Sequence, residues 1–323
     1  MITRSSNPIH LAVAFDKNFL TPFYVLVTSI FANNTDNFVC IHAIVSGISD
    51  EEKEKLKSYI QANQGDIFFY SLTEQQVDSL RQAIKDPKYT LATFYRLFIP
   101  ILLPDTIERI IYIDTDIVII NDLAELYQMQ FEEPFAAVVD PAPTIRTDLG
   151  ITRPGNYFNA GVLLINLQAW RREKISERAL DFVIQFPEKC KYVDQCALNA
   201  VSIGNWKKID SRYNLMGQYA PDLLKNEYTE FLDDKVIVHF NIFKPWDRLC
   251  QMRLRFLYHH YFDMSPEKGK KRYKKFNFTF KNVARLVRNK TVGIYRDYLA
   301  VNHTYERIKP AENLLREQQL SPH

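Results

Sequence analysis

Residues 109–122 read RIIYIDTDIVIIND, and two carboxylates interrupt this otherwise apolar stretch. The run IIYI is typical of a buried strand, and Asp114 and Asp116 follow it directly. In open α/β sheets, ligands bind beyond the carboxyl ends of the strands. Because two carboxylates this close repel each other unless a cation lies between them, the pattern indicates a Mg²⁺ or Mn²⁺ site. The alternative is a helix N-cap beside a surface turn residue, and the short pattern alone leaves both open.

Up to about residue 210, short apolar runs alternate with longer periodic segments. Strands are predicted at residues 10–15, 38–45, 66–72, 109–114, 135–140 and 160–167. Capping boxes, Ser49 with Glu52 and Thr73 with Gln76, open two helices, and the apolar segment 93–103 predicts a buried helix. Alternating strands and helices imply βαβ units, so we expect an α/β fold with a mainly parallel central sheet flanked by helices.

Composition excludes several classes of protein. The 323 residues are 46% apolar and 24% charged, which is ordinary for a globular chain. The four cysteines form no CxxC pair, and no signal peptide, membrane-spanning run or Gly-rich phosphate loop is present. We therefore expect a cytoplasmic protein with free thiols.

Six segments, taken together and in order, resemble family 8 glycosyltransferases, enzymes of the GT-A nucleotide-diphospho-sugar transferase fold that include bacterial lipopolysaccharide galactosyl- and glucosyltransferases. They are AVAFDKNF (12–19), TFYRL (93–97), YIDTDIVIINDLAELY (112–127), YFNAGVLLINLQAWR (157–171), DQCALN (194–199) and HFNIFKPW (239–246). They span about three-quarters of the chain. Two features depart from the family pattern: Ile242 replaces a glycine in a shortened His239–Lys244 loop, and Lys17 replaces a common aspartate.

The resemblance implies a metal-dependent, retaining transfer of galactose or glucose from UDP-galactose or UDP-glucose to a glycan acceptor. Mn²⁺, or Mg²⁺, would be held by Asp114, Asp116 and His239, with the imidazole favouring manganese. The donor would contact Ala14, Asp16, Asn18, Arg96, Thr115 and Lys244. For Asp16 and Asn18, a strand-to-helix turn explains the residue types equally well, and for Arg96 the alternative is a structural salt bridge.

The resemblance also assigns the sugar-binding and catalytic residues. Asn159 and Ala160 would hold the sugar together with Asp140, Asp194 and Gln195, which form the catalytic set. Asp194 also fits an N-terminal helix cap, and Asp140 fits a turn with Pro141. Because a glutamine is a poor nucleophile, front-face attack with Gln195 beside the anomeric carbon is favoured over a covalent intermediate.

The C-terminal part of the chain is strongly basic. Residues 265–290 hold ten Lys or Arg and one acidic residue, interleaved with aromatic side chains. Such a mixture suits an anionic membrane surface, nucleic acid or a solvated face; the resemblance favours the membrane, and no nucleic-acid partner is expected. We predict a GT-A catalytic domain at 1–248, a helical basic region at 249–323, and a peripheral location at the inner face of the membrane.

Two other functions fit parts of the sequence. A metal-dependent phosphotransferase with an aspartyl nucleophile also uses a strand-end DxD, but Ile117 and Val118 follow the motif where that class has Gly or Thr. A non-catalytic binding or scaffold protein on a glycosyltransferase fold would account for the shortened His239–Lys244 loop.

Overall fold

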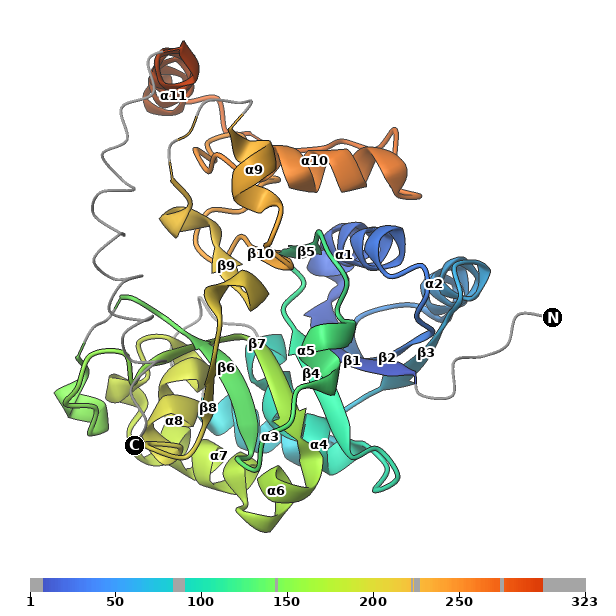
Figure 1. Cartoon of the computed structure of the whole chain (residues 1–323), viewed down its shortest axis with the longest axis vertical. Coiled ribbons are helices and arrows are strands. Elements are labelled where there is room, and N and C mark those ends of the chain that lie inside the picture. Colours follow the sequence, from blue (N-terminus) through green and yellow to red (C-terminus); the bar gives the residue numbers. More distant parts are fainter. Residues whose placement is uncertain are drawn as a thin grey trace. The chain divides into compact units, whose positions relative to one another are not determined.

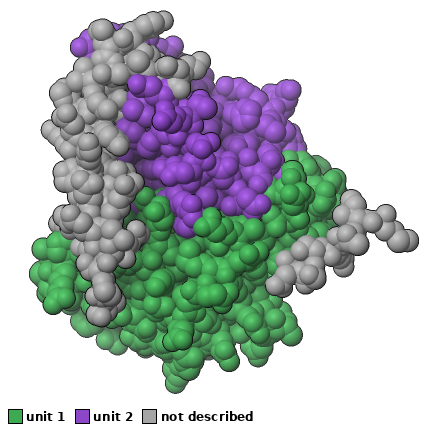
Figure 2. All heavy atoms as spheres, viewed as in Figure 1, with its two compact units in different colours: residues 1–20, 34–115, 123–211 green, residues 21–33, 116–122, 212–323 purple. Residues whose placement is uncertain are grey.

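The structure is a computed structural model that describes residues 8–83, 91–142, 145–221, 223, 227–273 and 276–298. The chain forms two compact units. Unit 1 comprises residues 1–20, 34–115 and 123–211, and unit 2 comprises residues 21–33, 116–122 and 212–323 (Figure 2). The domain boundary predicted at residue 248 stays a prediction.

Unit 1 is built on a seven-stranded sheet in the order β3-β2-β1-β4-β7-β6-β8 (Figure 1). Its strands are β1 (Ile9–Asp16), β2 (Val39–Ser46), β3 (Gly65–Tyr70), β4 (Arg109–Ile113), β6 (Phe135–Val139), β7 (Phe158–Asn166) and β8 (Lys207–Ile209). Strands β3, β2, β1 and β4 run parallel, and β6 is parallel to β8. Only β7 is antiparallel to both neighbours. The prediction of a mainly parallel central sheet is therefore confirmed.

The predicted strands are confirmed, because each contains or overlaps one of the strands observed. Along β4 and β7, the central strands, nearly every side chain is buried. A strand that is covered on both faces cannot alternate apolar and polar residues, which is why these strands form continuous apolar runs. The polar side chains needed for chemistry are therefore found after the strands end.

The helices of unit 1 are mostly short. They are α2 (Asp50–Ala62), α3 (Glu74–Ala83), α4 (Ile99–Leu102), α5 (Ala124–Gln128), α6 (Leu167–Arg172), α7 (Ile175–Gln185) and α8 (Val193–Val201), with 3₁₀ helices at Lys17–Phe19, Leu91–Phe98, Thr147–Leu149 and Pro187–Lys189. Both predicted capping boxes form: Ser49 with Glu52 before α2, and Thr73 with Gln76 before α3.

The continuous buried helix predicted for residues 93–103 is wrong in its form. Leu91–Phe98 is a 3₁₀ helix, and only Ile99–Leu102 is α-helical. Pro100 explains the change, because its ring would crowd the carbonyl group of Arg96 in an α-helix and it has no N–H to donate. Phe94 to Pro100 are buried as predicted, but Ile101 is 48% exposed.

Unit 2 holds a small sheet that the sequence did not indicate, in the order β5-β10-β9. Its elements are α1 (Leu20–Asn33), β5 (Ile117–Ile119), 3₁₀ helices at Ser211–Tyr213 and Gly217–Tyr219, β9 (Leu215–Met216), α9 (Tyr228–Leu232), β10 (Ile237–His239), α10 (Arg255–Met264) and α11 (Phe280–Tyr298). Side chains of α1 cover the free edge of β5: Ser29 Oγ accepts from Ile119 N at 2.9 Å, and Asn33 donates to Ile119 O at 3.0 Å. Among the described residues, no helix is long and apolar enough to span a bilayer.

Candidate active site

The two carboxylates of the Asp-x-Asp pattern stand at the end of β4, as predicted. Asp114 N donates to Gly161 O at 2.8 Å, which ties the residue to β7, and Tyr112 Oη donates to Asp114 Oδ1 at 2.7 Å. The Asp114 side chain is 25% exposed, whereas Thr115 and Asp116 are buried. Asp116 is followed immediately by β5, so strands on both sides hold the short connection in place.

Asp116 lies close to the side chains of two residues, His239 and Lys244, that are far from it in the sequence. His239 Nε2 is 3.4 Å from Asp116 Oδ1, and the Lys244 ammonium group pairs with Asp116 Oδ2. Burial alone would raise the pKa of Asp116, but the charges and hydrogen bonds of Lys244 and His239 outweigh burial and hold that pKa well below its usual range. Asp116 is therefore ionised at neutral pH, as a metal ligand must be.

His239 is oriented by Asn214, a residue that the sequence gave no reason to select. His239 Nδ1 and Asn214 Oδ1 are 3.0 Å apart, and this contact leaves Nε2 on the side of the ring that faces Asp116. Metal-bound histidines commonly make this kind of outer hydrogen bond. Asn214 stands beside β9, which is parallel to β10, and only this pairing brings it to His239.

The three predicted metal ligands form a group. Asp114, Asp116 and His239 each offer one ligand atom, and these atoms lie within 4.8 Å of one another. Asp114 and Asp116 are tied together by the single residue between them. Two carboxylate oxygens and one imidazole nitrogen are a suitable donor set for Mn²⁺ or Mg²⁺, so the residues present fit the ion.

The shortened loop after β10 has a defined conformation. Phe240 N donates to Asp116 O at 2.9 Å, while Ile242 and Phe243 are exposed. Lys244 Nζ also donates to the carbonyl groups of Phe240, at 3.2 Å, and Asn241, at 3.0 Å. The short loop thus turns the ammonium group of Lys244 back onto Asp116.

In unit 1, Arg96 joins three of the other predicted residues. Its guanidinium lies 2.5 Å from Asp194 Oδ2 and 3.3 Å from Asp114 Oδ1, and it donates to Ala160 O. It also lies over the ring of Tyr112, 4.7 Å from the ring centre. The predicted alternative of a structural salt bridge is therefore confirmed, and the donor contact stays a prediction.

Asp194 is the most deeply buried carboxylate of this group, only 1% exposed. Burial raises its pKa to about 6, and the negative charge of Asp114 acts in the same direction, whereas Arg96 opposes the shift. Asp194 lies inside the first turn of α8 rather than at its N-cap, which is Tyr192. Asp194 is therefore not the N-cap residue, although its carboxylate accepts hydrogen bonds from the backbone N–H groups of Asp194 and Gln195 in that first turn.

Gln195 is fixed by three hydrogen bonds. Its Oε1 accepts from Ala160 N at 3.1 Å and from Asn159 Nδ2 at 3.3 Å, and its Nε2 donates to Tyr157 Oη at 3.3 Å. Val193, two residues before Gln195, has φ of 52°. A left-handed conformation is strained for a β-branched residue, and such strain gathers at functional sites.

The remaining predicted residues also lie at strand ends of unit 1. Asp140 follows β6, is buried, and donates its N–H to Tyr157 O at 2.9 Å. Its Oδ1 accepts from Ala142 N at 3.2 Å, which confirms the predicted turn chemistry.

The turn after β1 follows the same pattern. Asp16 Oδ1 accepts from Asn18 N at 2.8 Å and opens a 3₁₀ helix, which confirms the predicted strand-to-helix turn. The parallel strands β1 and β4 pair Ala12 with Tyr112, so Ala14 and Asp114 stand two residues further along at the same edge of the sheet.

Comparison with known proteins now decides the family. The model named "Glycosyl transferase family 8" matches residues 10–250. The chain belongs to this family. It is therefore a glycosyltransferase, with the GT-A fold that the sequence predicted.

Several relatives of this family 8 glycosyltransferase have been described. General stress protein A of Bacillus subtilis is 27% identical over 80% of this chain and 94% of its own length. A lipopolysaccharide 1,3-galactosyltransferase of Salmonella typhimurium is 25% identical over 75% of this chain and 74% of its own. A lipopolysaccharide 1,2-glucosyltransferase of Escherichia coli is 26% identical over 78% of this chain and 77% of its own length. The solved structure of the galactosyltransferase LgtC with donor and acceptor sugar analogs has a TM-score of 0.67 at 21% identity, covering 86% of this chain and all of LgtC.

The Arg96–Asp194 pair generates a prediction about stability. Arg96→Met should lower the free energy of unfolding by about 3–5 kcal/mol, because it leaves Asp194 buried without its cation. The double variant Arg96→Met/Asp194→Leu should be more stable than Arg96→Met alone, since it also removes the unpaired charge. Urea unfolding followed by circular dichroism gives these values. The pairing would be contradicted if the double variant lost as much unfolding free energy as Arg96→Met and Asp194→Leu lose separately when added together.

Proposed function

We propose that this glycosyltransferase moves galactose or glucose from a UDP-sugar to a glycan acceptor of the cell surface, with retention at the anomeric carbon. The observation that carries the proposal is the Asp114–Asp116–His239 group at the end of β4. The names of the relatives, a lipopolysaccharide galactosyltransferase and a lipopolysaccharide glucosyltransferase, support the sugar and the acceptor class.

The nucleotide end of the donor is assigned to the first strand end and to the metal ligands. Ala14, Asp16 and Asn18 hold the uridine, and Thr115 lines the donor side between the two aspartates. Asp114, Asp116 and His239 would hold a divalent cation, whose charge would neutralise the negative charge that develops on the UDP diphosphate. Lys244 supplies a further positive charge to the diphosphate, which is consistent with its position at Asp116.

The sugar is assigned to the network around Gln195. Asp140, Asn159, Ala160 and Asp194 bind the hexose hydroxyl groups, and Arg96 holds Asp194 in place for this contact. Because Tyr157, Asn159 and Ala160 already fix the amide of Gln195, its carbonyl dipole is preorganised, at no cost during the reaction, to stabilise positive charge at the anomeric carbon.

The proposed chemical step needs no glutamine nucleophile. The bond between the anomeric carbon and the UDP oxygen breaks, and the acceptor oxygen bonds to that carbon on the same face. The acceptor proton passes to the departing UDP oxygen, so atoms and charge balance. Double displacement is the alternative mechanism, and it would require a nucleophile stronger than the neutral Gln195 amide.

A membrane location is proposed as well, and α11 supports it. Phe280, Val283, Val287 and Ile294 recur at helical spacing, and each is between 41% and 92% exposed. Arg285 and Arg288 are exposed beside this apolar stripe. An amphipathic helix of this kind binds in the interface of an anionic bilayer. Of the basic region predicted from the sequence, Lys274 and Lys275 lie outside the described residues.

Donor hydrolysis tests the proposed reaction. With Mn²⁺ and no acceptor, the wild-type chain should slowly hydrolyse UDP-galactose or UDP-glucose, and Asp116→Ala should abolish this activity without a change in circular dichroism. Asp122→Ala, which alters an aspartate shortly after the motif, is the matched control and should retain activity. A folded wild-type protein that hydrolyses neither sugar would favour the scaffold alternative, whereas phosphate release independent of UDP would favour the phosphotransferase.

A titration with Mn²⁺ tests whether His239 is a metal ligand. His239→Ala should raise the Mn²⁺ concentration for half-maximal hydrolysis by about tenfold or more, because one ligand is lost. Asn214→Ala should raise it in the same direction, since the ring loses its orienting hydrogen bond. Hydrolysis rates measured across a Mn²⁺ series give both values. An unmoved Mn²⁺ midpoint in both variants would remove His239 from the ligand set.

Membrane binding is tested on the full chain. Val283→Glu/Val287→Glu should reduce co-sedimentation with phosphatidylglycerol vesicles at least about tenfold, because two charges enter the apolar stripe. Ile184→Glu, which replaces an exposed apolar residue on α7, should bind as the wild type does. Binding should weaken as salt is raised, because exposed charges are screened. Equal co-sedimentation of all three proteins with the vesicles would exclude the apolar stripe of α11 as the membrane-binding surface.

A further inference from the structure

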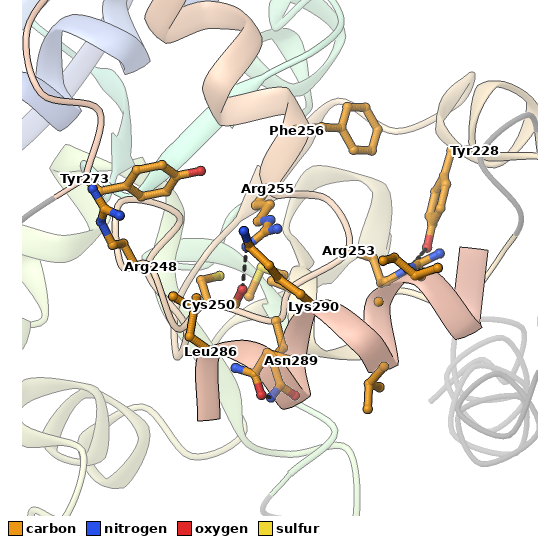
Figure 3. A pocket seen from close by; sticks show the side chains of 15 residues that line it. Tyr228, Arg248, Cys250, Arg253, Arg255, Phe256, Tyr273, Leu286, Asn289 and Lys290 are labelled. Carbon is orange, nitrogen blue, oxygen red and sulfur yellow. Dashed lines mark hydrogen bonds between the residues drawn. The ribbon is translucent and has the colours of Figure 1, made fainter. Parts of the chain in front are cut away.

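Unit 2 contains a cavity of about 670 Å³ that the proposed reaction does not use. One wall is the segment between Arg248 and Phe256, which enters α10, and another is one side of α11 (Figure 3). Asn289 of α11 ties the two walls together: its amide donates to Leu249 O at 3.1 Å, and its Oδ1 accepts from Gln251. The cavity is therefore built by specific hydrogen bonds between segments about 40 residues apart.

Among the described residues, the charged side chains that line the cavity are all cationic. They are Arg248, Arg253, Arg255 and Lys290. Arg255 donates to Cys250 O at 2.7 Å, and Arg248 lies 5.5 Å from the centre of the Tyr273 ring. These neutral partners fix the side chains in place and add no negative charge of their own. Within the described part of the chain, Arg248, Arg255 and Lys290 make no ion pair with a carboxylate.

Such an arrangement favours a bound anion. Gathering cations around one hollow costs Coulomb energy, and an anion that enters converts this repulsion into attraction. Arginine presents a planar fork that matches phosphate oxygens, while lysine adds a point charge. Both Arg255 and Lys290 line the cavity, and in the view of Figure 3 they are seen between Arg248 and Tyr273 on one side and Arg253 and Tyr228 on the other.

The cavity also has an aromatic side. Phe256 is 45% exposed, and its ring lies apart from the cationic groups, on the opposite side from α11 (Figure 3). A sugar ring has an apolar face of C–H bonds that packs on an aromatic ring, while amides such as Gln251 and Asn289 bind its hydroxyl groups. Cations, an aromatic ring and amides together match a phosphorylated sugar better than free phosphate, which would have no use for the aromatic side.

The chain joins this cavity to the candidate active site. Arg248 follows Lys244 by four residues, and the turns between them are closed by Asp247 N donating to Lys244 O at 2.9 Å and Cys250 N donating to Asp247 O at 3.1 Å. We propose that the cavity binds a phosphorylated sugar of the glycan acceptor, with Arg255 and Lys290 contacting the phosphate and Phe256 contacting the ring. That this sugar belongs to the acceptor rests on the proposed function, whereas the binding of a phosphorylated sugar in the cavity does not.

Calorimetry on the full chain tests the site, with UDP and Mn²⁺ at saturation so that the donor site is filled. The probes are glucose 6-phosphate, glucose and inorganic phosphate. Glucose 6-phosphate should bind at least about tenfold more tightly than either of the others, since only it engages both sides of the cavity. Arg255→Gln/Lys290→Gln should weaken its binding by about tenfold or more. The control Arg285→Gln/Lys281→Gln removes the same two residue types outside the cavity and should bind as the wild type does.

Three results would overturn the proposal: equal affinity for glucose and glucose 6-phosphate, equal affinity for inorganic phosphate and glucose 6-phosphate, or equal binding by the wild type and Arg255→Gln/Lys290→Gln. Displacement of glucose 6-phosphate by phosphatidylglycerol vesicles would assign the cavity to a lipid headgroup instead. Donor hydrolysis, measured in the same variants, should be unchanged. If the wild-type chain hydrolyses no UDP-sugar, the proposed function fails, while calorimetry still decides what the cavity binds.

Discussion

The guanidinium group of Arg96 is the cation that pairs with two carboxylates of unit 1, the buried Asp194 and the partly buried Asp114. Asp194 is almost wholly buried, and Asp114 lies at the end of a strand covered on both faces. An unpaired carboxylate in such surroundings would be expensive, and the pKa of Asp194, raised by burial, reflects that cost. Arg96 contacts both carboxylates and the backbone of Ala160, so one side chain connects β4, β7 and α8.

The position of Arg96 depends in turn on Pro100. Because Pro100 prevents an α-helix from forming through residues 93–103, the segment before it winds as a 3₁₀ helix. Arg96 lies within this 3₁₀ segment, and its apolar neighbours Phe94, Tyr95, Leu97 and Phe98 are buried with it. A conformational restriction at Pro100 thus bears on the backbone of the segment that carries the cation.

Asp116 obeys the same electrostatic rule with different partners. Burial alone would raise the pKa of Asp116, and Lys244 and His239 lower that pKa and keep the carboxylate ionised. Lys244 is also the residue from which the chain passes, within four residues, to the cations that line the cavity beside α11. Unit 2 therefore contributes positive charge in two places: at Asp116, where Lys244 pairs with a carboxylate, and in the cavity, where Arg248, Arg255 and Lys290 make no ion pair with a carboxylate among the described residues.

The sequence by itself determined the strands, the capped helices, the strand-end carboxylates and the family, because these follow from local patterns: continuous apolar runs, capping spacings and six ordered motifs. It also selected Arg96, since an arginine in so apolar a segment needs a partner. Only the tertiary structure decided which partner that is, because Asp194 lies 98 residues further along the chain. The same holds for Asn214, which meets His239 only through the pairing of β9 with β10, and for the cavity formed where α11 packs on the segment before α10. Contacts between distant segments depend on how strands pair and helices pack, and no local spacing of residues encodes that.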